Sequence, residues 1–203
     1  MNHSPLPWQA VFFDFDGVIA DSTKVKVRAF AALFAAYGPA VQEAVIRYHL
    51  DNGGMPRHQK IRHCFATLAG HLPADAELDC AGQTFSQLVL DEVIAAPLIP
   101  GALTTLQQLR QAAIPAFVVS GTPGEEMRLI VERKGLGSYF HEVHGSPLAK
   151  PALLADILSR HGYVPGQCLF IGDALADYQA AVATGLRFLG IAPAGRDSIF
   201  PRD

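Results

Sequence analysis

The first pattern able to do chemistry is a group of aspartates at the end of an apolar segment. In the stretch AVFFDFDGVIADS, residues 10–22, Asp14 and Asp16 are two positions apart. On a strand, side chains two apart leave the same face, so both carboxylates can face one site while Phe15 points into the core. That spacing suits a nucleophile beside a proton carrier. The alternative is a solvated acidic turn, and Asp21 is expected to be structural.

Three further polar motifs each follow an apolar segment. They are SGTPGEE with Ser120, Gly121 and Thr122, GSPLAKP with Lys150, and GDALAD with Asp173 and Asp177. Ligands of parallel sheets bind at the carboxyl ends of the strands, so all four motifs can converge on one edge. Each motif alone is more often a turn, a cap or a loop, but their joint occurrence in this order favours one site.

Carboxylates brought together at such an edge need a cation. If Asp14 and Asp173 lie within about 4 to 5 Å, their repulsion costs roughly 3 to 4 kcal/mol at an effective dielectric constant near 20. Oxygen ligands without His or Cys suit a hard ion, and Mg²⁺ also accepts phosphate oxygens of a substrate. The sequence therefore predicts a Mg²⁺ site.

The SGTPGEE motif predicts a strand end followed directly by a helix. Thr122 is expected as the N-cap, with Pro123 at the first helical position and Glu125 completing a capping box. The amides of Gly121 and Thr122, with the Ser120 hydroxyl, would then hold an anion at the positive end of the helix. Lysine at position 150 would add a full charge from a loop.

Five segments rich in Val, Ile, Leu and Phe are predicted to be strands. They are residues 10–15, 115–120, 141–145, 168–173 and 186–191. Segments of helical length lie between the last four and before the second, including 101–113 and 151–162, where leucines recur on one face. Alternating strands and helices predict an α/β fold with a Rossmann-like parallel-sheet core covered on both faces.

One stretch interrupts this alternation. From Ser22 to Pro97 the sequence has no convincing strand but several helical patterns, separated by prolines and by the NGG at 52–54. We expect residues 21–97 to form a small all-helical domain inserted after the first strand. Residues 1–20 and 98–203 would form the α/β core.

The composition is that of an ordinary folded protein. The chain has 203 residues, 50% hydrophobic and 17% charged, with a net charge of -3, which does not favour nucleic acid as a partner. Its three cysteines are far apart, so a disulfide framework is not indicated. The sequence has no signal-peptide pattern and no membrane-spanning apolar run. We expect a cytoplasmic protein without a membrane partner, either a monomer or a weak homodimer.

The motifs together resemble those of the haloacid dehalogenase-like superfamily, in its phosphatase and phosphomutase branch. They stand here as DFDGVIADS, VVSGT, AKP and IGDALAD, and the resemblance covers the whole chain. The helical insertion resembles the cap of phosphoglycolate phosphatase and β-phosphoglucomutase relatives. Ala174 departs from the family pattern, in which many relatives have Ser. The end of the chain, APAGRDSIFPRD, is shorter than the helical ending common in relatives.

The resemblance implies a role for each motif. Asp14 would attack phosphorus to form an aspartyl-phosphate, and Asp16 would protonate the leaving oxygen and then deprotonate the hydrolytic water. The other implied roles are neutralisation of the phosphoryl group by Ser120, Gly121 and Lys150, and a Mg²⁺ site formed by Asp14, the Asp16 carbonyl, Asp173 and Asp177.

A cationic run in the insertion is the candidate for substrate recognition. The segment NGGMPRHQKIRH, residues 52–63, contains Arg57, His58, Lys60 and Arg62, and Lys24 and Lys26 follow the first motif. Such runs are usually solvated helix faces. The functional hypothesis is that Arg57, Lys60 and Lys26 reach the substrate, while the NGG permits hinging or a close approach.

These features predict a Mg²⁺-dependent phosphatase acting on a small phosphorylated metabolite, a sugar phosphate or a phosphoglycolate-like monoester. A phosphomutase of the β-phosphoglucomutase type would use the same residues. A non-catalytic phosphate-binding module is the third hypothesis.

Overall fold

A parallel sheet is the centre of the fold. In the computed structural model, which describes residues 7–192, 195 and 197–201, five strands pair in the order β3-β2-β1-β4-β5. The strands are β1 Ala10–Phe13, β2 Ala116–Pro123, β3 Glu142–Ser146, β4 Cys168–Gly172 and β5 Arg187–Gly190. All neighbouring pairs are parallel, so the predicted α/β fold is confirmed.

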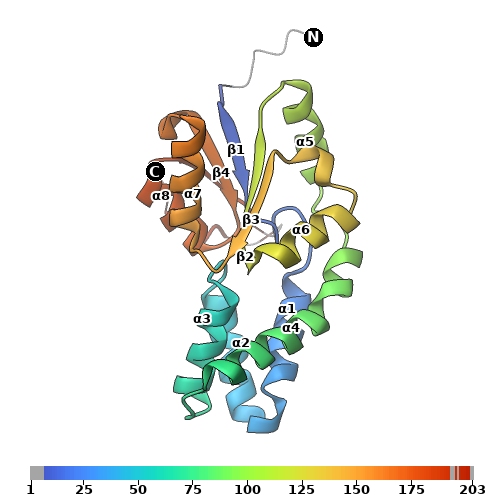
Figure 1. The fold of residues 1–203 in the computed structure, drawn as a ribbon, viewed down its shortest axis with the longest axis vertical. Helices are drawn as coiled ribbons and strands as arrows, with labels where there is room; N and C mark the ends of the chain where they lie inside the picture. The colour runs from blue at the N-terminus through green and yellow to red at the C-terminus, as the bar shows by residue number, and fades with distance from the viewer. Residues whose placement is uncertain (1–6, 193–194, 196, 202–203) are drawn as a thin grey trace.

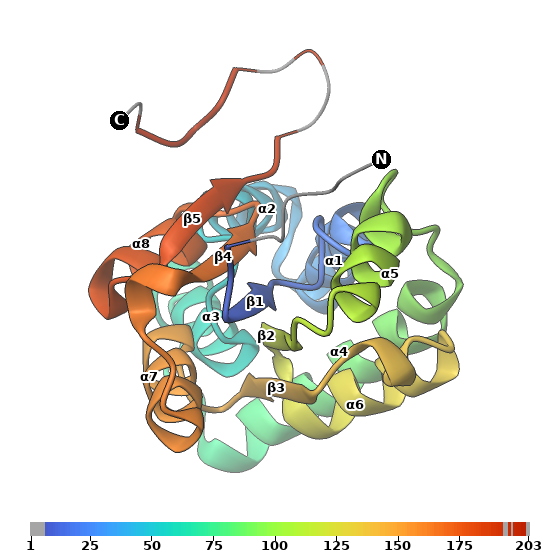
Figure 2. The same ribbon diagram turned by 90° about the horizontal axis from the view of Figure 1, so that it is seen from above.

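Helices cover both faces of this sheet. Figure 2 shows α5 Ala102–Gln111 and α6 Gly124–Arg133 on one face, and α7 Lys150–His161 and α8 Leu175–Thr184 on the other. Along β1, Val11 and Phe13 pack in the same core as α5 and α6, whereas Ala10 and Phe12 pack with α7 and α8. Successive strand side chains point to opposite faces, so a strand covered on both sides is apolar throughout.

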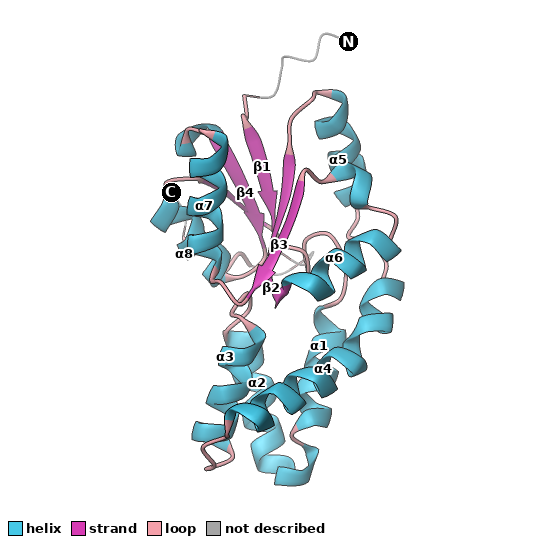
Figure 3. Ribbon diagram, in the orientation of Figure 1, coloured by secondary structure: helices cyan, strands magenta, loops and turns pink. Residues whose placement is uncertain are grey.

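A second lobe, here called the helical lobe, consists of residues 23–95. Its helices are α1 Thr23–Leu33, η1 Ala35–Tyr37, α2 Pro39–Asp51, α3 Arg57–His63, η2 Cys64–Leu68 and α4 Asp75–Ala95. The short helices η3 Gly137–Tyr139 and η4 Pro165–Gln167 belong to the other lobe, here called the sheet lobe, which contains the five strands. Figures 1 and 3 show the helical lobe at the end of the sheet toward which the strands point.

Two adjacent connections join the lobes. The Asp21 N–H donates to the Pro97 carbonyl, and the Ile99 N–H donates to the Ile19 carbonyl, both at 2.9 Å. An antiparallel bridge lies between these hydrogen bonds. The chain therefore leaves and rejoins the sheet lobe at one place, which is the geometry of a hinge.

Two predicted element ends are wrong near the aspartates and the lysine. β1 ends at Phe13, because the chain then turns through Gly17, which has a φ of 82° and donates its N–H to the Ala20 carbonyl at 2.8 Å. Asp16 lies in this turn instead of on the strand. α7 begins at Lys150 itself, so this lysine lies on a helix and not in the preceding loop.

The described residues include only part of each end of the chain. Residues 1–6, 193–194, 196 and 202–203, which include parts of both terminal segments considered above, lie outside them. No helix in the described part of the chain is long and apolar enough to cross a membrane.

Lys134 of the sheet lobe binds the C-terminal end of α4, the longest helix of the helical lobe. Its Nζ donates to the carbonyls of Val93, Ile94 and Ala96 at 3.3, 2.9 and 2.6 Å. Carbonyls at a helix C-terminus otherwise lack intrahelical donors, and a cation there is favourable.

We expect Lys134→Met to lower the free energy of unfolding by about 1.5 to 3 kcal/mol, because it removes charged hydrogen bonds. Urea denaturation would measure the change. The matched control is Lys24→Met on the exposed side of α1, which should change stability by less than about 0.5 kcal/mol. Equal small effects of the two substitutions would contradict this role for Lys134.

Candidate active site

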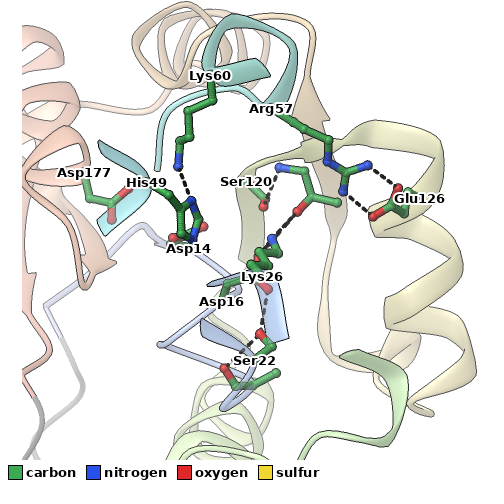
Figure 4. Close-up of polar contacts among 12 residues, drawn as sticks. Asp14, Asp16, Ser22, Lys26, His49, Arg57, Lys60, Ser120, Glu126 and Asp177 are labelled. Atoms are coloured by element: carbon green, nitrogen blue, oxygen red, sulfur yellow. Dashed lines mark hydrogen bonds and ion pairs between the residues drawn. The ribbon is translucent and has the colours of Figure 1, made fainter. Parts of the chain in front are cut away.

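A cavity of about 470 Å³ lies between the carboxyl end of the sheet and the helical lobe. The sheet lobe contributes Asp14, Asp16, Ser120, Gly121, Thr122 and Asp173, and the helical lobe contributes Lys26, Phe30, His49, Arg57, Lys60 and Phe85. Figure 4 shows part of this site, with Lys60 and Arg57 of α3 above Asp14, Asp16 and Ser120. Lys150 and Asp177 lie behind Asp14 and do not line the cavity.

Lys150 holds two of the aspartates together. Its Nζ lies 3.0 Å from Asp14 Oδ1 and also donates to Asp177 Oδ1, and all three side chains are buried. The Asp14 N–H donates to the Ile171 carbonyl of β4 at 2.9 Å, so Asp14 and Asp173 leave paired strands close together. Oxygens of Asp14, Asp173 and Asp177 all lie within 4.8 Å of one another.

This crowding changes the pKa values of the cluster. Burial, opposed by Lys150 and reinforced by Asp177, raises the pKa of Asp14 from 3.8 to about 6. Burial and the charges of Asp14 and Asp177 raise the pKa of Asp173 from 3.8 to about 8. Burial alone would lower the pKa of Lys150, but Asp14 and Asp177 outweigh it and raise that pKa. One ammonium group therefore faces three carboxyl groups, and the pKa values of two of them, Asp14 and Asp173, are raised.

The donor set fits a hard divalent cation. All three groups offer carboxylate oxygens, the ligands that Mg²⁺ and Ca²⁺ prefer. A Cβ on Gly17 would lie 2.0 Å from Asp173 Oδ2, so only glycine lets the first turn pass beside this carboxylate. Asp177 differs, because its Oδ1 accepts from Lys150 and its Oδ2 accepts from the Ala174 N–H at 3.1 Å. All three aspartates thus belong to the candidate metal group, and Asp177 in addition anchors Lys150.

Asp16 faces the same cavity in a different environment. Ser22 Oγ donates to its Oδ1 at 2.6 Å, Lys26 Nζ donates to its Oδ2, and Thr122 Oγ1 lies 3.4 Å from Oδ2. Burial would raise the pKa of Asp16, but the charge and hydrogen bond of Lys26 outweigh it and lower that pKa. The pKa of Asp16 is therefore lowered, whereas the pKa values of Asp14 and Asp173 are raised.

The predicted helix N-terminus at Thr122 is wrong. β2 stays extended to Pro123, where it pairs with Ser146 of β3, and α6 begins only after it with no side-chain cap. The Thr122 N–H donates to Ser120 Oγ at 3.1 Å, so this amide is not free for an anion. Strand pairing thus replaces the predicted cap, and Ser120, Gly121 and Thr122 reach the cavity from a strand end.

Arg57 joins the two lobes. Its guanidinium donates to Glu126 Oε1 at 2.5 Å, to Glu126 Oε2 at 2.9 Å and to Ser86 Oγ at 2.6 Å. The guanidinium also lies 4.5 Å from the Phe85 ring centroid. Burial would raise the pKa of Glu126, but Arg57 outweighs it and lowers that pKa. The guanidinium of Arg57, which the sequence predicted to reach a substrate, therefore binds Glu126 of α6 and Ser86 of α4 in this structure.

The other predicted cations divide between the cavity and the surface. Lys60 and Lys26 turn inward and line the cavity. His58 and Arg62 face solvent, beside Asp79 and Asp75 respectively, and Lys24 is also exposed. On α3, Arg57 and Lys60 are thus buried while His58 and Arg62 are exposed, as expected for an amphipathic helix.

Four residues at the site were not among the predicted ones. Ser22 binds Asp16, Ser86 and Glu126 bind Arg57, and His49 contacts Lys60 Nζ through Nδ1 at 3.1 Å. Of these four, His49 is the easiest to predict from the sequence. It lies four residues after Val45, and this spacing places both residues on the same, buried face of α2. The others depend on contacts between distant segments.

The NGG segment lies directly against the site. A Cβ on Gly121 would lie 2.8 Å from the Gly54 carbonyl oxygen and 3.0 Å from that of Met55. A Cβ on Gly53 would lie 2.9 Å from Ala174 Cβ. These glycines let the helical lobe approach β2 and the start of α8 closely, which is one of the two roles that the sequence suggested for the NGG segment.

Comparisons with known proteins agree on one family. The model of the haloacid dehalogenase-like hydrolases matches residues 8–185. Phosphoglycolate phosphatase 1 of Pseudomonas aeruginosa is 27% identical over 187 residues, 87% of this chain and 66% of its own, so the chain spans just under two thirds of that relative. Phosphoglycolate phosphatase of Synechococcus elongatus is 29% identical over 88% of this chain and 81% of its own. A putative haloacid dehalogenase-like hydrolase from Bacteroides fragilis superposes with a TM-score of 0.75 at 22% identity, over 97% and 95% of the two chains.

The raised pKa values of Asp14 and Asp173 predict how pH acts on the metal-free protein. An acid whose pKa is raised by folding binds protons more tightly when folded, so stability falls as pH rises from its unfolded to its folded pKa. For values of about 6 and about 8, the free energy of unfolding should fall between about pH 4 and pH 8. Mg²⁺ should stabilise the protein more at pH 8 than at pH 5.

Thermal unfolding with EDTA or with Mg²⁺ in excess would measure this difference. At a concentration 100 times its Kd, a ligand adds about 2.7 kcal/mol. Asp173→Asn should abolish most of the effect at pH 8. Equal stabilisation by Mg²⁺ at both pH values would count against a cation at this carboxylate cluster.

The Arg57–Glu126 pair predicts a large cost when one partner is removed. Both side chains are buried, at 4% and 9% exposure, so Arg57→Met should lower the free energy of unfolding by about 3 to 5 kcal/mol. Arg62→Met is the control, because the Arg62–Asp75 pair is exposed and should contribute less than about 1 kcal/mol. The double variant Arg57→Met/Glu126→Leu should recover most of the loss in urea denaturation. A double variant no more stable than Arg57→Met would contradict a buried charge as the cause.

Proposed function

The chain belongs to the haloacid dehalogenase-like hydrolases, and from this premise we propose that it is a Mg²⁺-dependent phosphatase of a small phosphorylated metabolite. The observation that carries the proposal is the convergence of Asp14, Asp16, Lys150 and Asp173 at one end of the sheet, beneath the helical lobe. A nucleophile, a proton carrier and a partly neutralised acidic cluster are the groups that phosphoryl transfer needs.

Asp14 is the proposed nucleophile. It follows the central strand, its Oδ1 is held by Lys150, and the side chain lines the cavity. A carboxylate fixed by a strand end and a buried ammonium group has little freedom to turn away from phosphorus. Attack by Asp14 would form an aspartyl-phosphate and release the alcohol, and water would then hydrolyse the intermediate.

Asp16 is the proposed proton carrier. Lys26 lowers the pKa of Asp16 and so favours the carboxylate form, which is the form that accepts a proton from attacking water. Protonation of the leaving oxygen requires the acid form. Phosphoryl oxygens that draw Lys26 away from Asp16 would raise the pKa of Asp16 toward that form.

Asp14 and Asp173 would hold the Mg²⁺, together with the Asp16 carbonyl. The ion would neutralise their charge and that of the phosphoryl group. Asp177 would act beside this site through Lys150 and the start of α8, since both its oxygens have donors. Ser120, Gly121 and Thr122 complete the proposed phosphate site at the end of β2.

Residues 21–97 are proposed to act as a cap over the core formed by 1–20 and 98–203. The paired hinge at Asp21 and Pro97 and the Arg57–Glu126 contact support this division. A closed cap would exclude water and place helical residues against the leaving group.

The substrate is proposed to be a sugar phosphate or a phosphoglycolate-like monoester in the cytoplasm. The cavity of about 470 Å³ is suited to a small metabolite. The curated relatives named phosphoglycolate phosphatase support a phosphomonoester. The free thiols of Cys64, Cys80 and Cys168 agree with a reducing compartment.

Phosphate release from a panel of phosphosugars, phosphoglycolate and nucleotides tests the proposal. The purified protein with Mg²⁺ should release phosphate from at least one compound, and Asp14→Asn should reduce kcat at least 10³-fold because it removes the nucleophile. Asp16→Asn should slow turnover by about 10² to 10⁴-fold, the usual contribution of acid–base catalysis.

Intact-mass measurement supplies an independent check. The wild-type protein should carry one acid-stable, base-labile phosphoryl group during turnover, and Asp14→Asn should carry none. Phosphate release by Asp14→Asn at the wild-type rate would contradict the proposed mechanism. Transfer to a hexose phosphate without phosphate release would identify a phosphomutase instead.

A further inference from the structure

A second group of metal-binding side chains lies outside the cavity, at the β3 edge of the sheet. Within the described part of the chain, His141, Glu142 and His161 each offer one ligand atom, and these atoms lie within 4.8 Å of one another. His161 ends α7, whereas Lys150, which contacts Asp14, begins it. A helix rises about 1.5 Å per residue, so the two ends of α7 are roughly 16 Å apart. The group is therefore separate from the carboxylates of the active site.

The two imidazoles of this group are held in place by the sheet and by aromatic rings. The His141 N–H donates to the Ala116 carbonyl at 2.7 Å, which fixes the start of β3 against β2. The rings of His141 and His161 both meet the Phe117 ring edge-on, with centroids 5.5 and 5.4 Å away. The His161 ring also stacks on Tyr163, with centroids 5.2 Å apart. Both imidazoles are thus positioned in advance, as a metal site requires.

Glu142 lies at the centre of the group and contacts only cations and imidazoles among its described side-chain partners. Its Oε1 lies 2.5 Å from His161 Nε2, and its Oε2 lies 2.6 Å from His144 Nε2. Arg160 donates to these two oxygens at 3.1 and 2.7 Å. With His141, three of the eight histidines of the chain gather around one carboxylate. The surroundings of Glu142 therefore suit a positive charge.

The ligand set differs in kind from that of the active site. Imidazole nitrogens with one carboxylate are typical ligands of Zn²⁺ and of other divalent transition metals, whereas oxygen ligands alone suit Mg²⁺. Ligand atoms around a four-coordinate Zn²⁺ lie about 3.3 Å apart. The three side chains, which lie at or near the surface, can reach that spacing by rotation.

Arg160 occupies the position of the counter-charge in the metal-free chain. Its side chain is 43% exposed, and its Nε also donates to Asp156 at 2.8 Å, one turn earlier on α7. An exposed ion pair contributes little to stability, so a metal ion can displace the guanidinium from Glu142. Arg160 would keep Asp156 as its partner after leaving.

We propose that His141, Glu142 and His161 form a second metal site, for a divalent transition metal such as Zn²⁺, which joins β3 to the end of α7. The ion takes the place of Arg160 beside Glu142, and water completes four-coordination. His144 keeps its contact with the other oxygen of Glu142 and orients the carboxylate. This site does not depend on the proposed phosphatase reaction.

Calorimetric titration with Zn²⁺ tests the site. Because Zn²⁺ can also bind the active-site carboxylates, the titration uses Asp173→Asn with Mg²⁺ in excess, and one Zn²⁺ per chain should bind. In that background, His141→Gln and His161→Gln should each weaken the affinity by about 100-fold or more, beyond the usual effect of losing an outer hydrogen bond. His71→Gln is the matched control, because His71 also pairs with a glutamate, Glu77, but belongs to no metal-binding group of the described residues. Failure to bind Zn²⁺, or equal binding by all three variants, would overturn the site.

Two further variants test the contacts of Glu142. His144→Gln should weaken the affinity by about 10- to 100-fold, because it removes the hydrogen bond that orients the ligand. Arg160→Gln should tighten the affinity by about two- to fivefold, because it removes a competing exposed ion pair. Arg128→Gln, which removes an exposed charge beside the Val143 carbonyl, should leave the affinity unchanged. Equal affinities of Arg160→Gln and Arg128→Gln would overturn the exchange of Arg160 for the metal.

A Co²⁺ spectrum distinguishes this site from the active site. Four-coordinate Co²⁺ absorbs visible light far more strongly than six-coordinate Co²⁺, so the wild-type protein with Co²⁺ should show intense bands. The bands should persist in Asp173→Asn and disappear in His141→Gln, whose exposed side chain can be replaced without unfolding the chain. Zn²⁺ should also raise the Tm of the Mg²⁺-saturated wild type but not that of His141→Gln. Bands that depend on Asp173 and not on His141 would overturn the proposal.

Discussion

Asp14, Asp173 and Asp177 lie together around the buried ammonium group of Lys150 at the carboxyl end of the sheet, and the other features of the site follow from holding them there. The pairing of β1 with β4 fixes Asp14 beside Asp173, and the start of α8 fixes Asp177. Like charges stay in contact only on a rigid frame, and regular secondary structure supplies it. Lys150 offsets one charge, so the remaining excess suits a cation.

The helical lobe places three cations near the carboxylates at this end of the sheet, and each cation has a different partner. Lys26 binds Asp16, Arg57 binds Glu126 of α6, and Lys60 contacts only the neutral His49 among the described hydrogen bonds. The first contact lowers the pKa of Asp16, the second joins the two lobes, and the third is made to a neutral ring instead of a carboxylate. Cations of one lobe, within reach of one cavity, thus differ in what they are available to bind.

The sequence predicted the three central strands well because β1, β2 and β4 are largely buried, so each contains an apolar run such as AVFF. The edge strands β3 and β5 are less buried and carry polar residues. The acidic positions were predictable since each acidic motif follows a strand. The Thr122 cap was not, because the choice between capping a helix and extending β2 depends on pairing with Ser146, which is distant in sequence. The role of Arg57 also depended on a distant partner, Glu126.

Asp177 shows most clearly what spacing leaves open. From its place in GDALAD it resembles a metal ligand as closely as Asp173 does, and its oxygens lie close enough to contribute. Its Oδ2, however, accepts the Ala174 N–H, which α8 leaves without an intrahelical partner, and its Oδ1 accepts from Lys150. If direct ligation displaced either donor, the Ala174 N–H would lose its partner or Lys150 would keep only its contact with Asp14. The described contacts of this carboxylate, with a helix start and with a lysine 27 residues away, therefore make it an anchor for Lys150, which its spacing in GDALAD alone does not show.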